Sequence, residues 1–169
     1  MIGLLAAAVA VAGGATTVDG DVVRGLVHLP VPAERVLAGL RDPTWEIRIA
    51  AEHTDVDVQG PDGACTIVSY VTPNPILEAR YTLRRCPTAT GWVSTLVEAN
   101  AMSAYRSAWT VEPADGGCQV AYEVEVHSAV WVPDALVRRQ TQQAIEGRMD
   151  ALRSWAARPA PAQESGSVP

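Results

Sequence analysis

The sequence predicts an α+β fold in which a curved, seven-stranded antiparallel sheet wraps around one long C-terminal helix, with two short helices after the first strand. Three observations predict it. Short segments of alternating apolar and polar residues follow one another over residues 53–128, separated by turns rich in Gly, Pro and Asp. The apolar period then changes to 3.6 residues over 133–157. An antiparallel meander has one apolar face to cover, and this helix is long enough to cover it.

The N-terminal part of the domain is expected to form one strand and two short helices. Residues 22–29 are rich in Val and Leu and alternate loosely, as a strand does. A helix follows, because Pro32 suits its first turn and Asp42-Pro43 stops it. A second short helix carries three apolar residues, which are Trp45, Ile47 and Ile49.

Six strands joined by short turns are expected next. In the first of them, Val56 and Val58 form the buried side, and the wet side carries His53, Asp55 and Asp57. Pro73 and Pro75 cannot donate to a strand ladder, so they mark the turn between the third and fourth strands. Arg80 alternates with Glu78 and Thr82, which assigns it to the outer face or rim, paired with a strand neighbour.

A long amphipathic helix is predicted from Pro133 to about Ala157. About 24 residues at 1.5 Å each span roughly 36 Å, enough to cross the whole sheet. The cations of residues 148–158 alternate with apolar positions, as on a solvated face. The apolar stripe consists of Val137, Thr141, Ala144, Ile145, Met149, Leu152 and Ala156.

The charge and the two ends of the chain restrict its partners and location. The formal net charge is -6, and the 13 cations form no basic stripe, so nucleic acid is not expected as a partner. Residues 1–15 are uncharged and apolar, which predicts an export signal, with an uncleaved membrane anchor as the alternative. We therefore expect a periplasmic or extracellular protein with one domain over 20–157 and a disordered tail over 158–169.

Three cysteines cannot all pair within one chain. Pairing around the Pro73 turn places Cys65 opposite residues 83–85, so a bridge to Cys86 is one possibility. Three unpaired thiols in core or strand positions are the other.

The sequence assigns no catalytic residue, metal site or cofactor. His53, Asp55 and Asp57 could hold a divalent cation, but the solvated side of a strand explains them, and we predict no metal. None of the nucleophile or zinc-hydrolase motifs occurs. A proton-transfer enzyme that uses a single Arg, Tyr or Glu in an apolar pocket remains an open alternative.

Several segments, in order over residues 22–157, resemble the START and Bet v 1-like superfamily, also called SRPBCC. "VHLPVPAERVLAGLRDPTW" resembles its first strand and following helix, and "YVTPNPILEARYTLRR" resembles a START turn and strand. "WTVEPADGGCQVAYEVEV" resembles its last hairpin, and "WVPDALVRRQTQQAIEGRMDALRSWA" its terminal helix. The resemblance implies a helix-grip fold with a hydrophobic cavity between sheet and helix. One position departs from it, because Tyr81 follows Arg80 where START proteins usually have Asp.

A cavity between the sheet and the long helix is the expected site. It would bind or transport a hydrophobic small molecule, a lipid or an isoprenoid, without catalysis and as a monomer, with transient membrane contact as a further expectation. The alternatives are an enzyme of the polyketide cyclase or aromatase type and a protein-interaction module that uses Trp131 and Trp155 as exposed anchors. The expected cavity residues are Tyr81, Leu83, Tyr105, Ser107, Trp109, Tyr122, Val124, Val137, Thr141, Ile145 and Met149. The competing interpretation is that these side chains simply fill the core.

Overall fold

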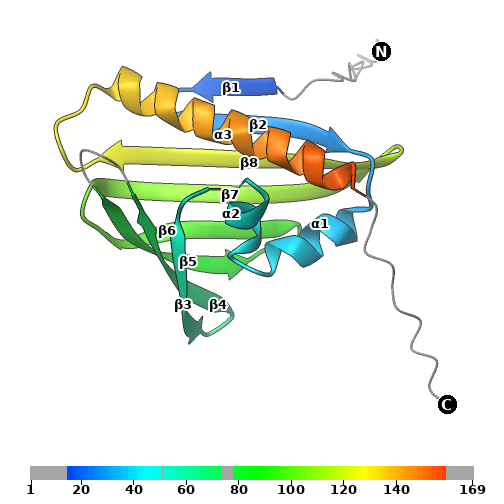
Figure 1. Ribbon diagram of the computed structural model, residues 1–169, viewed down its shortest axis with the longest axis horizontal. Coiled ribbons are helices and arrows are strands. Elements are labelled where there is room, and N and C mark those ends of the chain that lie inside the picture. Colours follow the sequence, from blue (N-terminus) through cyan, green and yellow to red (C-terminus); the bar gives the residue numbers. More distant parts are fainter. Residues whose placement is uncertain (1–14, 51, 74–77, 159–169) are drawn as a thin grey trace, which may run out of the picture.

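A computed structural model describes residues 15–50, 52–73 and 78–158 as an antiparallel sheet with three helices on one of its faces (Figure 1). The sheet has eight strands in the order β1-β2-β8-β7-β6-β5-β4-β3. The strands are β1 (Ala15–Asp19), β2 (Val22–Leu29), β3 (Asp55–Asp62), β4 (Cys65–Thr72), β5 (Ala79–Pro87), β6 (Gly91–Ala99), β7 (Met102–Ala114) and β8 (Gly117–Ser128). The helices are α1 (Ala33–Leu40), α2 (Trp45–Ile49) and α3 (Asp134–Ala156).

The α+β helix-grip architecture is confirmed, but the prediction of seven strands was wrong. The additional strand is β1, which pairs antiparallel with β2 from Ala15↔Leu26 to Asp19↔Val22. The residues of β1 directly follow the apolar N-terminal run. No strand was therefore predicted between that run and the strand over residues 22–29. Thr and Val favour a strand here, and Gly20, with φ 59°, supplies the left-handed turn into β2.

The long helix covers only part of the sheet. α3 packs on β1, β2 and β8, and its axis follows these strands in Figure 1, so the expectation that this helix alone covers the apolar face was wrong. The contact is close at Gly25, where an added Cβ would overlap the side chains of Ile145 and Met149. The short helices α1 and α2 follow β2 in the chain and lie toward the remaining strands (Figure 1).

The concave face therefore carries two buried clusters. The larger lies between α1, α3 and the strands β2, β7 and β8, and includes Leu29, Leu40, Val120, Ile145 and Leu152. The smaller lies under α2 and consists of Ile47, Val68, Tyr70 and Leu83. Helices from both ends of the domain are thus needed to cover one curved sheet.

A disulfide joins Cys65 of β4 to Cys86 of β5, which decides between the two interpretations of the cysteines. Thr66 pairs with Arg85 in the register of β4 and β5, so Cys65 and Cys86 are opposite each other at the next position of the ladder. The third cysteine, Cys118, is buried and unpaired. Such bridges persist mainly in oxidising compartments, which is compatible with export.

Three further predictions concern the position of Arg80, the two sides of β3, and metal binding. Arg80 points outward, with 71% of its side chain exposed and its Nε 2.6 Å from Oε1 of Glu78, as predicted. His53 precedes β3 instead of lying on it. Val56 is partly buried against the smaller cluster, as predicted, but Val58 is 47% exposed, so the predicted buried side was wrong at Val58. No metal-binding cluster of His, Cys, Asp or Glu occurs among the described residues.

The two tryptophans proposed as exposed anchors differ from one another. Trp131 is 94% exposed, as predicted. Trp155 is half-buried, with its ring edge-on to Trp45 at a centroid distance of 5.0 Å and the Arg35 guanidinium 4.6 Å above it, so its predicted exposure was wrong.

Residues 1–14 and 159–169, which include nearly all of the predicted export signal and disordered tail, lie outside the described residues. None of the described helices is both long and apolar enough to cross a membrane.

Candidate functional site

All four tyrosines of the chain meet on the concave face of the sheet. Tyr70 and Tyr81 are directly paired across β4 and β5, and their rings stack at a centroid distance of 5.1 Å. Tyr105 on β7 is 6.3 Å from Tyr81 and brings its hydroxyl 3.3 Å from that of Tyr122 on β8. Trp109 stacks on Tyr122 at 4.0 Å. We call these five residues the aromatic belt; it spans the face because side chains at alternate strand positions share a side.

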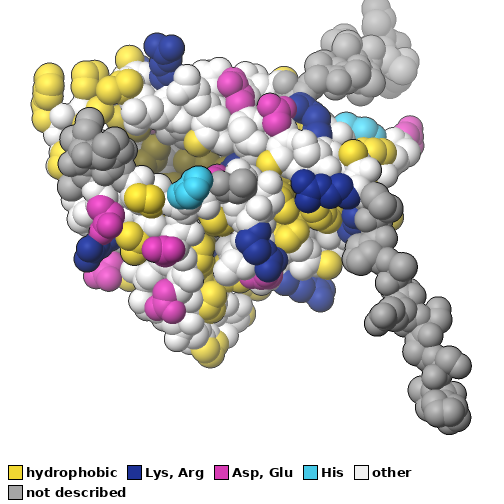
Figure 2. All heavy atoms as spheres, in the orientation of Figure 1, with side chains coloured by type: hydrophobic (Ala, Val, Ile, Leu, Met, Phe, Trp, Pro, Cys, Tyr) yellow, Lys and Arg dark blue, Asp and Glu magenta, His cyan; other side chains and the backbone are white. Residues whose placement is uncertain are grey.

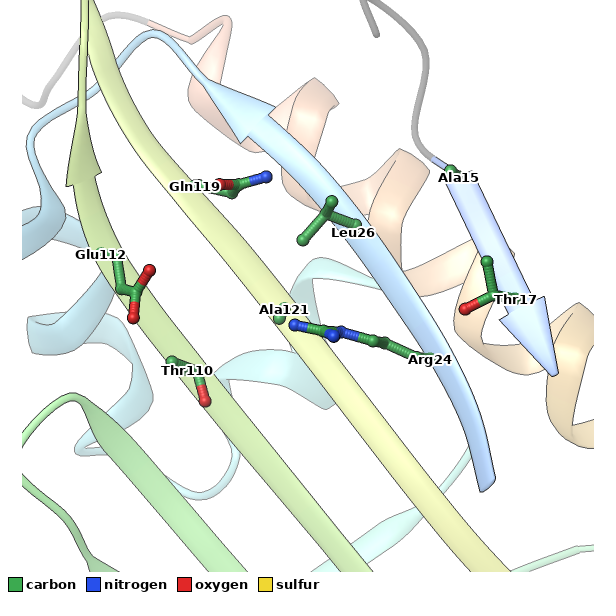
Figure 3. Close-up of a pocket in the computed structure, with 8 residues that line it drawn as sticks. All are labelled: Ala15, Thr17, Arg24, Leu26, Thr110, Glu112, Gln119 and Ala121. Carbon is green, nitrogen blue, oxygen red and sulfur yellow. The ribbon is translucent and has the colours of Figure 1, made fainter. Parts of the chain in front are cut away.

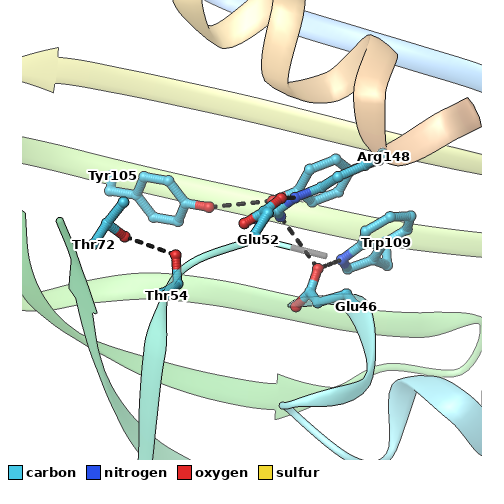
Figure 4. A network of polar contacts seen from close by, with 8 residues as sticks. Glu46, Glu52, Thr54, Thr72, Tyr105, Trp109 and Arg148 are labelled. Atoms are coloured by element: carbon cyan, nitrogen blue, oxygen red, sulfur yellow. Dashed lines mark hydrogen bonds and ion pairs between the residues drawn. The ribbon is translucent and has the colours of Figure 1, made fainter. Parts of the chain in front are cut away.

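Arg148 of α3 forms hydrogen bonds with one end of the belt and with the segment that contains α2 (Figure 4). Its Nε and Nη2 donate to the two carboxylate oxygens of Glu52 at 2.8 and 3.0 Å. Its Nη1 donates to the Tyr122 hydroxyl at 2.9 Å and to Glu46 at 3.3 Å. Glu46 also accepts the indole N–H of Trp109 at 2.9 Å. We call Arg148, Glu46 and Glu52 the Arg148 clasp; it ties α3, α2 and the sheet together with charge-assisted hydrogen bonds.

The electrostatics of the belt keep its phenols neutral. Burial raises the pKa of Tyr81 to about 12, and burial likewise raises the pKa values of Tyr70, Tyr105 and Tyr122 above the ordinary value of 10.0. Burial alone would lower the pKa of Arg148, but Tyr122, Glu46 and Glu52 raise it well above its ordinary value. Near neutral pH the belt therefore offers hydroxyl groups beside a permanently charged guanidinium.

A recess of about 390 Å³ opens beside the clasp, between α3, the segment before β3 and the end of β4. Figure 2 shows the surface hollowed below α3, with hydrophobic side chains visible in its depth. Two residues of its lining contact the belt: Arg148 donates to the Tyr122 hydroxyl, and Thr72 forms a hydrogen bond with Tyr81. The recess is lined by Ala50, Glu52, His53, Thr54, Thr72, Pro73, Gln143, Ala144, Gly147 and Arg148.

Two other hollows lie on the sheet. One, of about 280 Å³, is on the sheet face opposite the helices, where Arg24, Thr110, Glu112 and Gln119 surround small side chains (Figure 3). Another, of about 400 Å³, lies across β4, β5 and β6, where the β5–β6 register shifts after Thr82, and its lining includes Tyr70 and Tyr81 of the belt. Both are formed largely by the outer side chains of a sheet, so we assign no binding role to either.

The structure brings together most of the predicted cavity residues. Leu83, Ser107, Trp109, Tyr122, Val124, Ile145 and Met149 are buried, and Tyr81 and Tyr105 are half-buried beside them. Val137 and Thr141 are half-buried on α3, but they line neither the recess nor the buried clusters. The Thr141 hydroxyl instead donates to the carbonyl oxygen of Val137 at 2.9 Å. The recess uses a neighbouring strip of the helix, at residues 143–148.

With this geometry established, comparison with known proteins identifies the family. Residues 21–156 match the family described as polyketide cyclase/dehydrase and lipid transport. The chain belongs to this family. A comparison with curated protein sequences finds no match.

Several solved structures are similar in fold to this chain. The Zhui aromatase/cyclase from Streptomyces sp. R1128 superposes with a TM-score of 0.71 at 16% identity, covering 83% of this chain and 96% of that one. A START superfamily protein from Mycobacterium smegmatis gives 0.70 at 12% identity, with 81% and 97% covered. A STAR-related lipid transfer protein from Xanthomonas axonopodis gives 0.60 at 17% identity, with 86% and 99% covered. These TM-scores show a shared START-like fold.

In this member of the polyketide cyclase and lipid transport family, two cations lie on the concave side that were not predicted from the sequence. Arg148 was assigned to a solvated face, but its side chain is only 16% exposed. Arg85 is 4% exposed, its guanidinium lies 5.3 Å from the centroid of the Trp92 ring, and its Nε and Nη2 have no hydrogen-bond partner among the described residues. A signal for Arg85 was present, because it alternates with Tyr81 and Leu83 along β5.

Proposed function

We propose that this chain binds a hydrophobic small molecule, a lipid or an isoprenoid, against the aromatic belt without changing it chemically. The observation that carries the proposal is an open recess whose lining contacts the belt of neutral tyrosines, through Arg148 to Tyr122 and through Thr72 to Tyr81. Aromatic rings provide a broad apolar contact, and their hydroxyl groups can donate to a ligand's oxygen atom. We therefore expect a mostly apolar ligand with at least one hydroxyl, carbonyl or carboxyl group.

The size of the recess supports a small-molecule ligand. Its volume of about 390 Å³ lies at the lower end of the range of roughly 300–1,000 Å³ that is usual for ligand pockets. A ligand that buries ~300 Å² of apolar surface at ~25 cal/mol/Å² gains about 7 kcal/mol before association costs. That gain is sufficient for binding in the micromolar range when the pocket is preformed.

The state of the acidic groups supports binding without catalysis. Glu46 and Glu52 lie nearest the belt, and both accept hydrogen bonds from Arg148, so neither is a free base beside a ligand. A raised pKa keeps Tyr81 protonated and therefore unsuited to removing a proton near neutral pH.

A cyclase or aromatase function is the second candidate, and Arg85 favours it. A buried guanidinium with free N–H groups could bind and polarise a ligand carbonyl on the same side of β5 as the belt. Incubation with an oxygenated polyketide chain and mass spectrometry of the products separates the two functions. Recovery of the ligand unchanged supports a binding protein, whereas loss of water that requires Arg85 supports an enzyme.

The binding proposal is tested with a matched pair of α3 variants. Ala144 is exposed and lines the recess, and Ala135 is exposed on the same helix outside it. Ala144→Trp should block the recess and weaken binding by about tenfold or more, while Ala135→Trp should bind as the native chain does. Ligands that co-purify with the chain are identified by organic extraction, with denatured protein as the control. Further ligands are taken from a lipid panel and tested for stabilisation of the chain. If no lipid co-purifies or stabilises the chain, or if Ala144→Trp binds normally, the proposal fails.

A further inference from the structure

A compact apolar patch lies on the connection between β8 and α3. Trp131 is 94% exposed, and Val130 and Leu136 are 42% and 45% exposed. We call these three residues the Trp131 patch. They are half of the six large hydrophobic side chains that are exposed in the described part of the chain, and they fall within seven consecutive positions. Figure 2 shows hydrophobic side chains gathered at the upper left, where this connection runs in Figure 1.

The patch lies at the same end of the sheet as the recess. The N–H of Ala129, beside the patch, donates to the carbonyl of Ala101 in the β6–β7 turn at 2.9 Å. In that turn, the side chain of Asn100 accepts from the N–H of Arg80 at 2.9 Å and donates to the carbonyl of Glu78 at 2.8 Å. The start of β5 is paired with the end of β4, where Thr72 and Pro73 line the recess. Backbone and side-chain hydrogen bonds thus link the patch to the mouth of the recess.

We propose that the Trp131 patch docks the chain on the surface of a lipid bilayer. An exposed tryptophan has an apolar ring and a single N–H, a combination suited to the boundary between headgroups and acyl chains. Asp134 is the one charged residue over 129–137, so insertion of the patch brings little charge into that boundary. Nearby on α3, Nη1 of Arg138 is 3.7 Å from Oδ1 of Asp21, so the carboxylate of Asp21 partly neutralises the charge of Arg138.

The exposed area of the patch favours a bilayer over a protein partner. One tryptophan and two half-exposed aliphatic side chains offer on the order of 300 Å². A stable protein interface usually buries about 800 Å² on each partner, so the patch alone is too small for a second copy of this chain. A bilayer accepts single side chains, and such contact is weak and reversible. Because the net charge is -6, we expect zwitterionic lipid to suffice and anionic lipid to give no gain.

Docking of the patch places the recess near the membrane, where a hydrophobic ligand can enter without crossing bulk water. This purpose rests on the proposed function, but the docking itself needs no ligand. The two can therefore fail separately. Loss of docking in a patch variant should leave ligand binding in vesicle-free solution unchanged.

The test uses the full chain with phosphatidylcholine vesicles, some of which contain lipids brominated along the acyl chains as fluorescence quenchers. The difference in emission between the native chain and Trp131→Phe reports on Trp131 alone. We expect vesicles to quench this difference signal. Trp131→Ser should lower the vesicle-bound fraction by about tenfold or more, and Trp131→Phe should retain most of it. Val97→Ser is the matched control, because Val97 is 55% exposed on β6 and should not affect docking.

The outcomes distinguish docking of the patch on a bilayer from non-specific hydrophobic binding and from dimer formation. An unquenched difference signal overturns the proposal, even if other parts of the chain hold it on the vesicles. Equal losses in Trp131→Ser and Val97→Ser would also overturn it, because surface hydrophobicity alone would then explain binding. Sedimentation without vesicles tests the remaining occupant: a dimer that Trp131→Ser abolishes would assign the patch to a second copy of the chain.

Discussion

Replacement of Arg148 by Met is the most direct test of how the site is held together. The side chain of Arg148 is 16% exposed and contacts Glu46, Glu52 and Tyr122. Methionine preserves much of the apolar stem but removes every charged donor of the clasp. Glu46, whose side chain is 10% exposed, then keeps only the Trp109 N–H as a donor. The substitution should therefore destabilise the fold through a buried, incompletely paired carboxylate.

The magnitude follows from the exposure of the two acidic partners. Removal of one member of a buried ion pair typically costs 3–5 kcal/mol, because the remaining charge stays desolvated. Glu52 is 29% exposed and can regain water, so the lower end of this range applies. We expect a loss of about 3 kcal/mol in the free energy of unfolding, which corresponds to roughly 10 °C in Tm for a domain of this size.

Urea denaturation followed by tryptophan fluorescence measures the effect. Arg153→Met is the matched control, because Arg153 lies on the same helix in an exposed pair with Asp150 and should lose under ~1 kcal/mol. A Glu46→Gln substitution should cost clearly less in the Arg148→Met background than in the native chain, since the two residues interact. If Arg148→Met is no more destabilised than Arg153→Met, the clasp does not hold α2 over the belt and our reasoning is refuted.

Two further predictions concern the belt and the disulfide. Because burial raises the pKa of Tyr81 to about 12, the folded state keeps the phenol proton that the unfolded chain loses near 10, so stability should fall as pH rises from about 10 toward 12. Ultraviolet titration of tyrosinate should show delayed ionisation in native protein only; coincident native and denatured curves would contradict this. Reduction of the Cys65–Cys86 bridge, with its sequence separation of 21, should cost about 3 kcal/mol, measured as a shift of the urea midpoint. An unchanged midpoint would show that the bridge adds no stability.

The sequence predicted the parts of this fold that depend on local periodicity. The strand over 22–29, the short helix around Trp45 and the C-terminal helix all appear where the pattern of apolar residues placed them. β1 was missed, because five residues after a long apolar run give too short a pattern to separate from it. The position of α3 was missed for a different reason. Its length shows that it can span the sheet, but its direction depends on the close fit at Gly25, which no local pattern contains.

The site follows the same division between local pattern and packing. Alternation along β7 placed Tyr105, Ser107 and Trp109 on one face, and they lie there in the structure. The pairing of Arg148 with Glu46 joins residues 102 positions apart in sequence, and no period connects two such elements.

A helix edge that looks solvated in the sequence becomes buried only because α2 folds against it. Arg148 lies next to Met149 at the margin of the apolar stripe, where a long side chain can reach either water or the interior. Two carboxylates, Glu46 in α2 and Glu52 in the connection that follows it, make the interior favourable, since together they satisfy the guanidinium that burial would otherwise penalise. Polar groups within an apolar cavity are therefore the residues that a single sequence predicts least well. Under the proposed function, they are also the groups that would select among oxygen-bearing ligands.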